Sequence, residues 1–400
     1  MPINLDKKIW PEKAKAKNWA SLDWSTIRKY GMGIFVTEGN MYAKELSFFG
    51  ITRPIPDEEC AITSLCSGNI YRIYGATSGK KSHLFTYLPK GTEGVVLDIG
   101  VVGDDTAVKN SVVVTSESLV IGGTSSISGD KYEGGKLFEY AAPVNIGDFV
   151  QEWHIQPQKI KMITIPVKGE GIGGMLIDNA RGLVYGISDK TGILFSYDVK
   201  TKKVKKLGEV NKKVFSTAIT MDQKGRIFGV GYGGKIFCYD PIQEDIRTLE
   251  IFMPSFAGRN LYDTLKAITF DPVNELVYGG TTEGNLFVFN PVNFEIKSLG
   301  CPTNLKGIRC LSVTNDGRVF GMSGEDEDMN HMFCYDPRTG ELKDMGIPIA
   351  SMEKRWYGYK IDCMTTGSDG EIYLGEADRI SNLFVYHPAI PRLKLKKQNE

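Results

Sequence analysis

The chain has 400 residues, with 48 Lys plus Arg and 48 Asp plus Glu, so its formal net charge is zero. This balance gives no global attraction to nucleic acid or to an anionic membrane surface, and no apolar run reaches the roughly 20 residues of a membrane-spanning helix. Residues 1–17 lack the apolar core of a signal peptide, which indicates a soluble protein, either cytoplasmic or secreted with its signal removed. Seven cysteines without Cys-x-x-Cys spacing do not indicate a disulfide framework or a zinc site.

The first segment, residues 1–59, is predicted to be an N-terminal extension. Ala, Lys and Trp at irregular helical spacing suggest a short helix within Pro11–Tyr30. Two later stretches, Gly33–Val36 and Leu46–Ile51, have the pattern of a short strand. Residues 391–400 are expected to form a polar C-terminal tail.

Residues 60–390 contain seven copies of one repeat. Each copy has short strand signals bounded by Gly, Pro, Asn and Asp, and its third strand carries a hydrophobic-aromatic pair. The copies are Cys60–Val102, Asn110–Val167, Gly174–Val210, Thr217–Met253, Ala267–Leu299, Arg309–Met345 and Asp362–Pro388.

Four antiparallel strands form one sheet, and several sheets packed radially bury the faces that a single sheet leaves exposed. The sequence therefore predicts an all-β fold, a seven-bladed β-propeller of four-stranded antiparallel blades. The last copy ends after its third strand, so we expect an N-terminal strand to close the ring.

In a propeller, the loops that enter the innermost strands and the loops between the second and third strands open on one face. Long loops on a rigid scaffold are usually where function is carried, and several loops predicted for this face are long. Candidate functional residues are therefore those where one repeat departs from the others at this face.

The second strand offers one departure. Gly follows the aromatic residue in most copies, as at Gly186, Gly229 and Gly279, whereas the first copy has Arg72 after Tyr71. A guanidinium binds a carboxylate or phosphate in a two-pronged fashion, so Arg72 is a candidate ligand-binding residue. An interblade salt bridge is the alternative.

The first residue of the third strand offers a second departure. Two of the four histidines, His83 and His331, hold this position and are candidates for general base or acid. Lys136 and Lys235 hold it in other copies and are assigned to substrate binding. An inert surface histidine is the alternative for either one.

A third set of candidates lies where each innermost strand begins. In each copy this residue is found twelve positions before the glycine position of the second strand. These residues are Cys60, Asn110, Gly174, Thr217, Ala267, Arg309 and Asp362. Arg309 and Asp362 lie on adjacent blades and are expected to pair. Asn110, Thr217 and Asp362 are candidates for oxygen ligands of a structural calcium ion in the central channel.

Two entry loops combine aromatic and basic residues. One contains Arg259 and Tyr262, and the other contains Arg355, Trp356 and Tyr357. Such groups suit sugar rings and uronate carboxylates, but they also dominate protein interfaces. The predicted partner is an anionic oligo- or polysaccharide, with neither nucleic acid nor a membrane.

The repeat region resembles the seven-bladed propellers of polysaccharide lyases, in particular the rhamnose-glucuronate type. Related oligogalacturonate lyases use clustered metal-binding histidines, which four scattered histidines do not match. The resemblance implies β-elimination at a uronate. Arg72, Arg309 or Arg355 would neutralise the carboxylate, and His83 or His331 would remove the proton at C5. Tyr262, Tyr357 or the other histidine would protonate the leaving oxygen.

The alternatives are a non-catalytic propeller that binds a protein or glycan, and a glycoside hydrolase, for which no matched carboxylate pair stands out.

Overall fold

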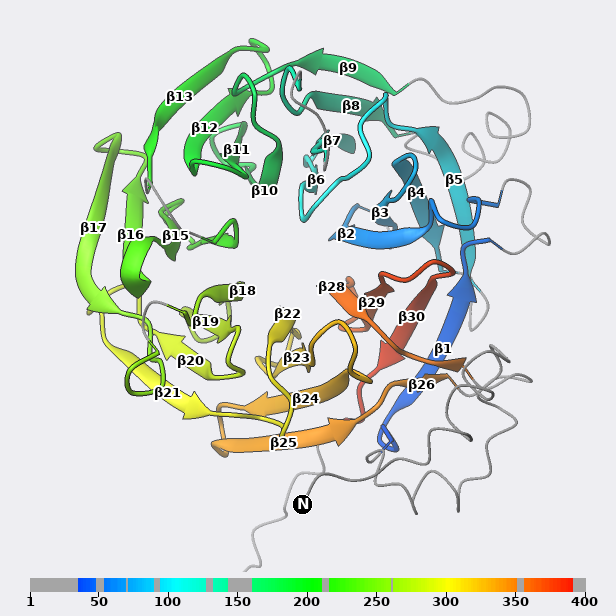
Figure 1. Cartoon of the computed structure of the whole chain (residues 1–400), viewed down its shortest axis with the longest axis vertical. Coiled ribbons are helices and arrows are strands. Elements are labelled where there is room, and N and C mark those ends of the chain that lie inside the picture. Colours follow the sequence, from blue (N-terminus) through cyan, green and yellow to red (C-terminus); the bar gives the residue numbers. More distant parts are fainter. Residues whose placement is uncertain are drawn as a thin grey trace, which may run out of the picture.

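The computed structural model describes residues 35–47, 54–69, 71–89, 94–126, 132–142, 160–210, 216–259, 262–350 and 356–390. In this part of the chain, seven four-stranded antiparallel sheets surround a central axis as blades (Figure 1). The predicted all-β, seven-bladed propeller is confirmed. None of the described residues form a helix long and apolar enough to cross a membrane. The predicted helix in Pro11–Tyr30 and the tail 391–400 lie outside the described residues.

The first four blades follow the chain order. Blade 1 contains β2 (Ala61–Ser67), β3 (Ile73–Ser78), β4 (His83–Leu88) and β5 (Val95–Val101). Blade 2 contains β6 (Val112–Val114), β7 (Leu119–Gly123), β8 (Leu137–Ala141) and β9 (Lys161–Thr164). Blade 3 contains β10 (Ile172–Asp178), β11 (Leu183–Ser188), β12 (Ile193–Asp198) and β13 (Val204–Glu209). Blade 4 contains β14 (Ile219–Met221), β15 (Ile227–Val230), the 3-10 helix η2 (Tyr232–Gly234), β16 (Lys235–Asp240) and β17 (Asp245–Phe252).

The remaining blades complete the ring. Blade 5 contains β18 (Leu265–Asp271), β19 (Leu276–Thr281), β20 (Leu286–Phe289) and β21 (Ile296–Gly300). Blade 6 contains β22 (Ile308–Val313), β23 (Val319–Ser323), β24 (His331–Asp336) and β25 (Glu341–Gly346). A small hairpin, β26 (Ile349–Ala350) and β27 (Trp356–Tyr357), follows. Blade 7 contains β28 (Ile361–Thr366), β29 (Ile372–Glu376), β30 (Asn382–His387) and β1 (Asn40–Glu45).

The hydrophobic-aromatic pair of the third strand packs on both faces of its blade. In β4, Leu84 packs toward blade 2, whereas Phe85 and Tyr87 pack toward blade 7, and all three are fully buried. The same division recurs in the other blades, so the core consists of apolar layers between neighbouring blades. Strands buried on both faces need consecutive apolar residues, which explains why the pair is repeated.

An N-terminal strand closes the ring, as predicted, but neither proposed segment forms it. Strand β1 lies between them and pairs antiparallel with β30, so the two ends of the propeller lie side by side (Figure 1). Met41 and Ala43 face the layer between blades 6 and 7, and Tyr42 faces the layer between blades 7 and 1. This outermost strand is partly exposed, and its polar residues weaken the apolar pattern on which the prediction relied.

Candidate functional site

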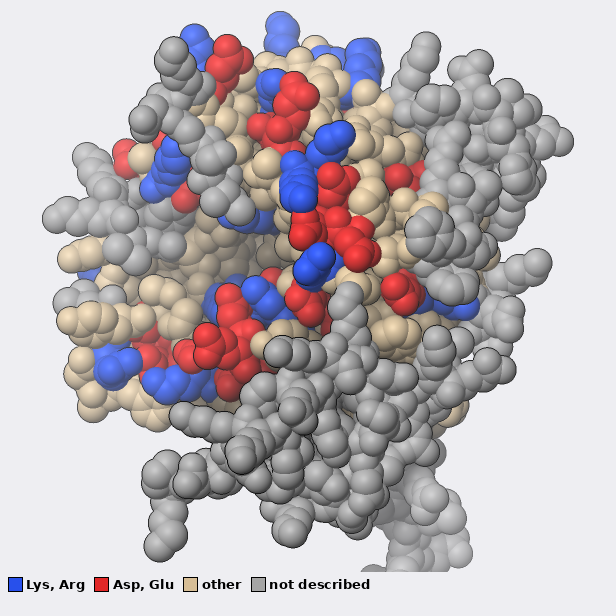
Figure 2. Space-filling view, turned by 45° about the vertical axis from the view of Figure 1, so that its right-hand side comes forward, with Lys and Arg blue, Asp and Glu red and all other residues tan. Residues whose placement is uncertain are grey.

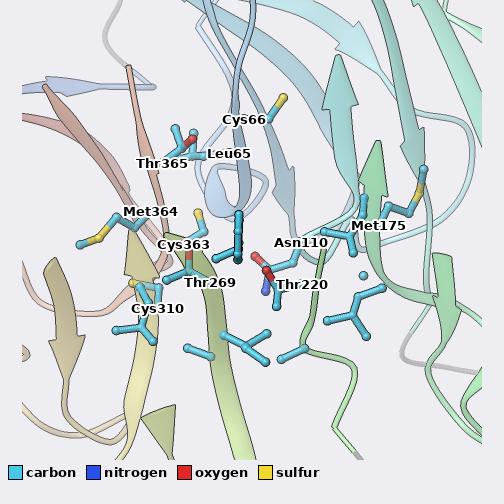
Figure 3. A pocket seen from close by; sticks show the side chains of 18 of the residues that line it. Leu65, Cys66, Asn110, Met175, Thr220, Thr269, Cys310, Cys363, Met364 and Thr365 are labelled. Carbon is cyan, nitrogen blue, oxygen red and sulfur yellow. The ribbon is translucent and has the colours of Figure 1, made fainter. Parts of the chain in front are cut away.

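A cavity of about 500 Å³ occupies the central channel. The innermost strands of the blades line it, and Figure 3 shows sulfur-bearing side chains such as Cys310, Cys363 and Met364 among the lining residues. Most of the lining is apolar or hydroxyl-bearing. Among the described residues of this lining, the charged ones are Lys266 and Arg309, and both are cations. The cavity is therefore suited to a ligand with an anionic group.

A β-bulge sets the charged residues at one end of the cavity. In blades 1, 3, 5, 6 and 7 the pairing of the two innermost strands skips one residue near the entry of the first strand. Bulges redirect side chains and are common beside active sites. The skipped residues, together with the equivalent residues of blades 2 and 4, form what we call the mouth ring. Its members are Thr63, Asn110, Gly173, Thr217, Lys266, Arg309 and Asp362.

The mouth ring corrects three of the seven positions expected from the sequence. Thr63 replaces Cys60, Gly173 replaces Gly174, and Lys266 replaces Ala267. The twelve-residue count failed in blades 3 and 5 because the turn after their innermost strand is one residue longer. In blade 1 it failed because the count began from the wrong residue, Arg72.

Arg309 and Asp362 form the expected pair in the mouth ring, where Arg309 is buried and Asp362 is half-buried. Nε of Arg309 donates to a carboxylate oxygen of Asp362 at 2.7 Å, and Nη2 contacts the same carboxylate. Nη1 of Arg309 lies 2.9 Å from Asp326, which also pairs with Lys360 at 3.1 Å. Burial would lower the pKa of Arg309, but the carboxylates of Asp362 and Asp326 outweigh it and raise the pKa. Positive and negative side chains are grouped along the border of a hollow in the surface (Figure 2).

Lys266 is the charged member of the mouth ring that sequence reasoning missed. It forms no ion pair or hydrogen bond with the residues that the structure describes. Burial lowers its pKa from the ordinary value and the nearby positive charge of Arg309 lowers it further, and together they outweigh the opposite effect of the carboxylates of Asp362, Asp326 and Glu325. A lysine of this kind can accept a proton or bind an anion. The available signal was a single charged residue in an otherwise apolar strand entry, Leu265-Lys266-Ala267.

Arg72 does not occupy the glycine position of blade 1. Gly75 faces Phe85 across the sheet as Gly186 faces Phe195, and a Cβ built on Gly75 would lie 2.2 Å from the Phe85 ring. The glycine is therefore needed because the aromatic ring of the third strand crosses it. Arg72 precedes β3 and His83 follows it, so the two lie at opposite ends of this strand. Arg72 is buried beside Tyr74, on the face opposite the mouth ring.

His83 is buried between two carboxylates. Its Nδ1 lies 3.1 Å from Asp98, and its Nε2 lies 3.0 Å from Glu59. Burial would lower the pKa of His83, but these two carboxylates outweigh it and raise the pKa. A histidine whose raised pKa favours the protonated form, and whose two nitrogens both contact carboxylates, is poorly placed to accept a proton from a ligand.

His331 repeats part of this arrangement in blade 6. Its Nδ1 lies 3.0 Å from Asp344, and Asp344 accepts a hydrogen bond from the backbone of Gly346, as Asp98 does from Gly100. In blade 5, Asn285 and Ser298 make the same type of contact at the same bulge. This recurrence indicates that the polar pair stabilises the bulge between the third and fourth strands. The assignment of His331 to proton transfer stays a prediction.

Lys136 and Lys235 also lie at the starts of third strands. Lys235 binds Glu250 at 2.7 Å and lies over the ring of Phe252. Lys136 is half-buried, and its backbone pairs with Thr124. Neither lysine lines the channel cavity, so their role in substrate binding stays a prediction.

The two aromatic-basic loops differ in placement. Tyr262 is 73 % exposed, with Arg259 over its ring and Glu283 paired with Arg259. Tyr357 is buried against Phe35 and Ile347 in the β26–β27 hairpin. Trp356 packs on the apolar layer between blades 6 and 7. Arg355 lies outside the described residues. Tyr357 and Trp356 therefore stabilise the hairpin, and neither lines the channel cavity.

The proposed oxygen ligands of a calcium ion lie close to cations, and their assignment stays a prediction. The carboxylate of Asp362 forms an ion pair with Arg309. Asn110 and Thr217 line the same cavity as the cations Lys266 and Arg309. A divalent cation would be repelled there. Among the residues that the structure describes, no group of three or more His, Cys, Asp and Glu is arranged to hold a metal.

No protein-family model matches the chain, and no curated protein matches it either. Solved structures of similar shape include virginiamycin B lyase from Staphylococcus aureus, with TM-score 0.59 and 10 % identity over 86 % of this chain and 99 % of that one. A streptogramin B lyase has TM-score 0.59 and 10 % identity over 87 % of this chain and 98 % of that one.

A third similar structure is the extracellular domain of a candidate one component system from B. thetaiotaomicron. It has TM-score 0.56 and 15 % identity over 87 % of this chain and 40 % of that one. A rhamnose-glucuronate lyase is not among these three structures, so the resemblance to propeller lyases holds only loosely. At these identities the comparisons show the seven-bladed propeller fold.

Proposed function

We propose that the protein is a carbon-oxygen lyase that cleaves a uronate-containing glycan by β-elimination at the mouth ring. The observation that carries this proposal is Lys266, a lysine that lines the cavity beside Arg309 and forms no ion pair or hydrogen bond with a carboxylate among the described residues. Elimination needs a positive environment for the uronate carboxylate and a base for the adjacent proton. Our candidates for these two roles are Arg309 and Lys266, which lie in adjacent blades of the mouth ring.

In this proposal the uronate carboxylate takes the place of the exposed Asp326, which pairs with both Arg309 and Lys360, and so binds these two cations. The neutral amine of Lys266 takes the proton from C5, and the electron pair of the C5–H bond forms the C4–C5 double bond. The bond between C4 and the glycosidic oxygen breaks. The leaving oxygen then takes the proton from Lys266, which restores the neutral amine. A lowered lysine pKa favours this role because it raises the fraction of neutral amine near neutral pH.

A second candidate function is a propeller that binds an anionic ligand without chemistry. The observation that favours it is the absence of any Asp, Glu, His or Tyr from the described lining of the cavity. In that case Lys266 stays protonated and pairs with the anion.

The test compares Lys266→Arg and Lys266→Met with the wild-type protein on polygalacturonate, alginate, hyaluronan and a rhamnose-glucuronate polymer. The readout is the ultraviolet absorbance of the unsaturated product. Arginine keeps the charge but cannot act as a base. If the lyase proposal holds, both variants lose about 10²- to 10⁴-fold in rate, and the arginine variant still binds the polymer. The wild-type rate also rises with pH as the amine is deprotonated.

His331→Ala serves as the comparison, because it tests the histidine prediction in the same assay. Absence of product from all four polymers, with Lys266→Met but not Lys266→Arg weakening binding, would establish the binding function instead. Full activity in Lys266→Met would overturn both roles of the lysine.

A further inference from the structure

Exposed aromatic side chains gather on one stretch of the face that carries the mouth ring. Five aromatic residues of the described chain are at least half exposed, and four of them are Tyr232 (52 %), Phe252 (50 %), Phe256 (51 %) and Tyr262 (73 %). We call these four residues the aromatic platform. All four lie at the ends or in the loops of blades 4 and 5 that open on this face.

Backbone contacts join the segments that carry the platform. The N–H of Met253 donates to the carbonyl of Gly234 at 2.7 Å, which connects the end of β17 to the turn that contains Tyr232. In the following loop, Arg259 donates to Phe256 at 2.9 Å and Tyr262 donates to Arg259 at 2.8 Å. The four rings therefore lie on two segments that backbone hydrogen bonds connect.

Cations lie against the platform, but their charge is largely balanced. Lys235 lies over the ring of Phe252 at 5.3 Å and pairs with Glu250. Arg259 lies over the ring of Tyr262 at 5.8 Å, and Glu283 pairs with both Arg259 and Lys306. Three cations and two carboxylates leave a net charge of one positive. A net charge of one positive suits a polymer with sparse negative charge, and it does not suit the dense phosphates of a nucleic acid.

Contacts run from the platform to the mouth ring. Lys306, which pairs with Glu283, directly precedes Gly307 in the loop that enters blade 6. Nζ of Lys266 lies 3.7 Å from the position that a Cβ at Gly307 would take. A polymer seated at Lys266 can therefore continue outward over blade 5 toward blade 4.

We propose that the aromatic platform is an extended binding site for the sugar rings of an anionic polysaccharide whose cleaved unit lies at the mouth ring. The proposal rests on the proposed function. Exposed flat rings bury the apolar faces of sugars, and the half-exposed cations beside them meet an occasional uronate carboxylate. The substrate class is thereby narrowed from any uronate glycan to a long chain that spans both sites.

The experiment uses the double variant Phe252→Ala/Phe256→Ala of the full chain. Its control is Ile242→Ala/Val292→Ala, two residues exposed at 80 % and 61 % in the loops between third and fourth strands, on the opposite face. Binding is measured as retardation in gels that contain each of the four polymers named above. Thermal melting verifies that both variants are folded.

We expect the platform variant to bind the retarding polymer about tenfold more weakly, with the control variant unchanged. Product formation from a disaccharide of the same glycan should be unaffected. The KM for the long polymer should rise without a matching fall in kcat.

The outcomes for the platform and for the lyase are separable. Weaker polymer binding without product from any polymer supports the platform and overturns the lyase. Product formation with unchanged polymer kinetics in the platform variant overturns the platform and leaves the lyase intact. If no polymer retards the wild-type protein, the platform is not a glycan site, and a protein partner becomes the occupant to test.

Discussion

At the residue scale, one structural position of the propeller carries different chemistry in neighbouring blades. The bulge residue is Lys266 in blade 5, Arg309 in blade 6 and Asp362 in blade 7. Arg309 and Asp362 satisfy each other, and this leaves the amine of Lys266 as the unpaired charged group among the described members of the mouth ring. Function can thus change at this position without altering the blade that supports it.

The two histidines at the third-strand starts differ in burial, and this difference gives a stability prediction. We expect His83→Gln to lower the free energy of unfolding by about 3 kcal/mol, because the buried Asp98 and the half-buried Glu59 lose their shared partner. The raised pKa of His83 makes its stabilisation full below about pH 6.5, and the stabilisation is lost as pH rises through the raised value. Urea unfolding at several pH values measures this trend.

His331→Gln is the matched control. His331 occupies the same position with one carboxylate instead of two, so its loss should be smaller. Equal losses for the two variants, independent of pH, would contradict the ion-pair interpretation of His83.

At the element scale, the blade depends on a contact between its second and third strands. A glycine of the second strand faces a Phe of the third strand in six blades, and a Cβ at that glycine would enter the ring. The glycine at this position therefore reflects packing across the sheet, not backbone conformation. The repeated glycine could therefore be seen in the sequence, but the contact with the Phe ring that requires it could be seen only in the structure.

Gly279 offers a clear test of this contact. A Cβ there would lie 2.1 Å from Cζ of Phe287, so we expect Gly279→Ala to cost about 1–3 kcal/mol of stability. Phe287→Leu shortens the side chain that the new methyl group meets. The double variant should therefore lose less than the sum of the single losses, as measured in a double-mutant cycle of urea unfolding. Additive losses would show that the ring is not the cause.

At the scale of the whole molecule, strand β1 joins the two ends of the propeller. Met41 and Ala43 are 5 % exposed and pack into the layer between blades 6 and 7. This strand completes the last blade, so a defect in it is a defect in the closure of the ring.

We expect Met41→Lys to destabilise the protein by about 3 kcal/mol or more, because it buries an unpaired charge in an apolar layer. Asn40→Lys, one residue earlier at an exposed position of the same strand, should be near neutral. Urea unfolding and limited proteolysis report the two effects. A Met41→Lys variant as stable as Asn40→Lys would show that β1 is dispensable for closure.

The sequence by itself determined the all-β class, the seven repeats and the closure by an N-terminal strand. These follow from local signals, namely alternating apolar residues, turn residues and the hydrophobic-aromatic pair such as Leu286-Phe287. The pairing of Arg309 with Asp362 was also predictable, because both positions could be aligned from the repeat.

Only the tertiary structure decided which residues reach the channel. A bulge changes the register by one residue, and a one-residue change in a strand moves a side chain to the other face, so Lys266 could not be placed without the cross-strand pairing. The burial of His83 between Asp98 and Glu59, and the packing of Tyr357 against Phe35, likewise arise from contacts between distant segments. Local patterns specify the scaffold, whereas the charge at the mouth of the channel depends on register and on contacts distant in sequence.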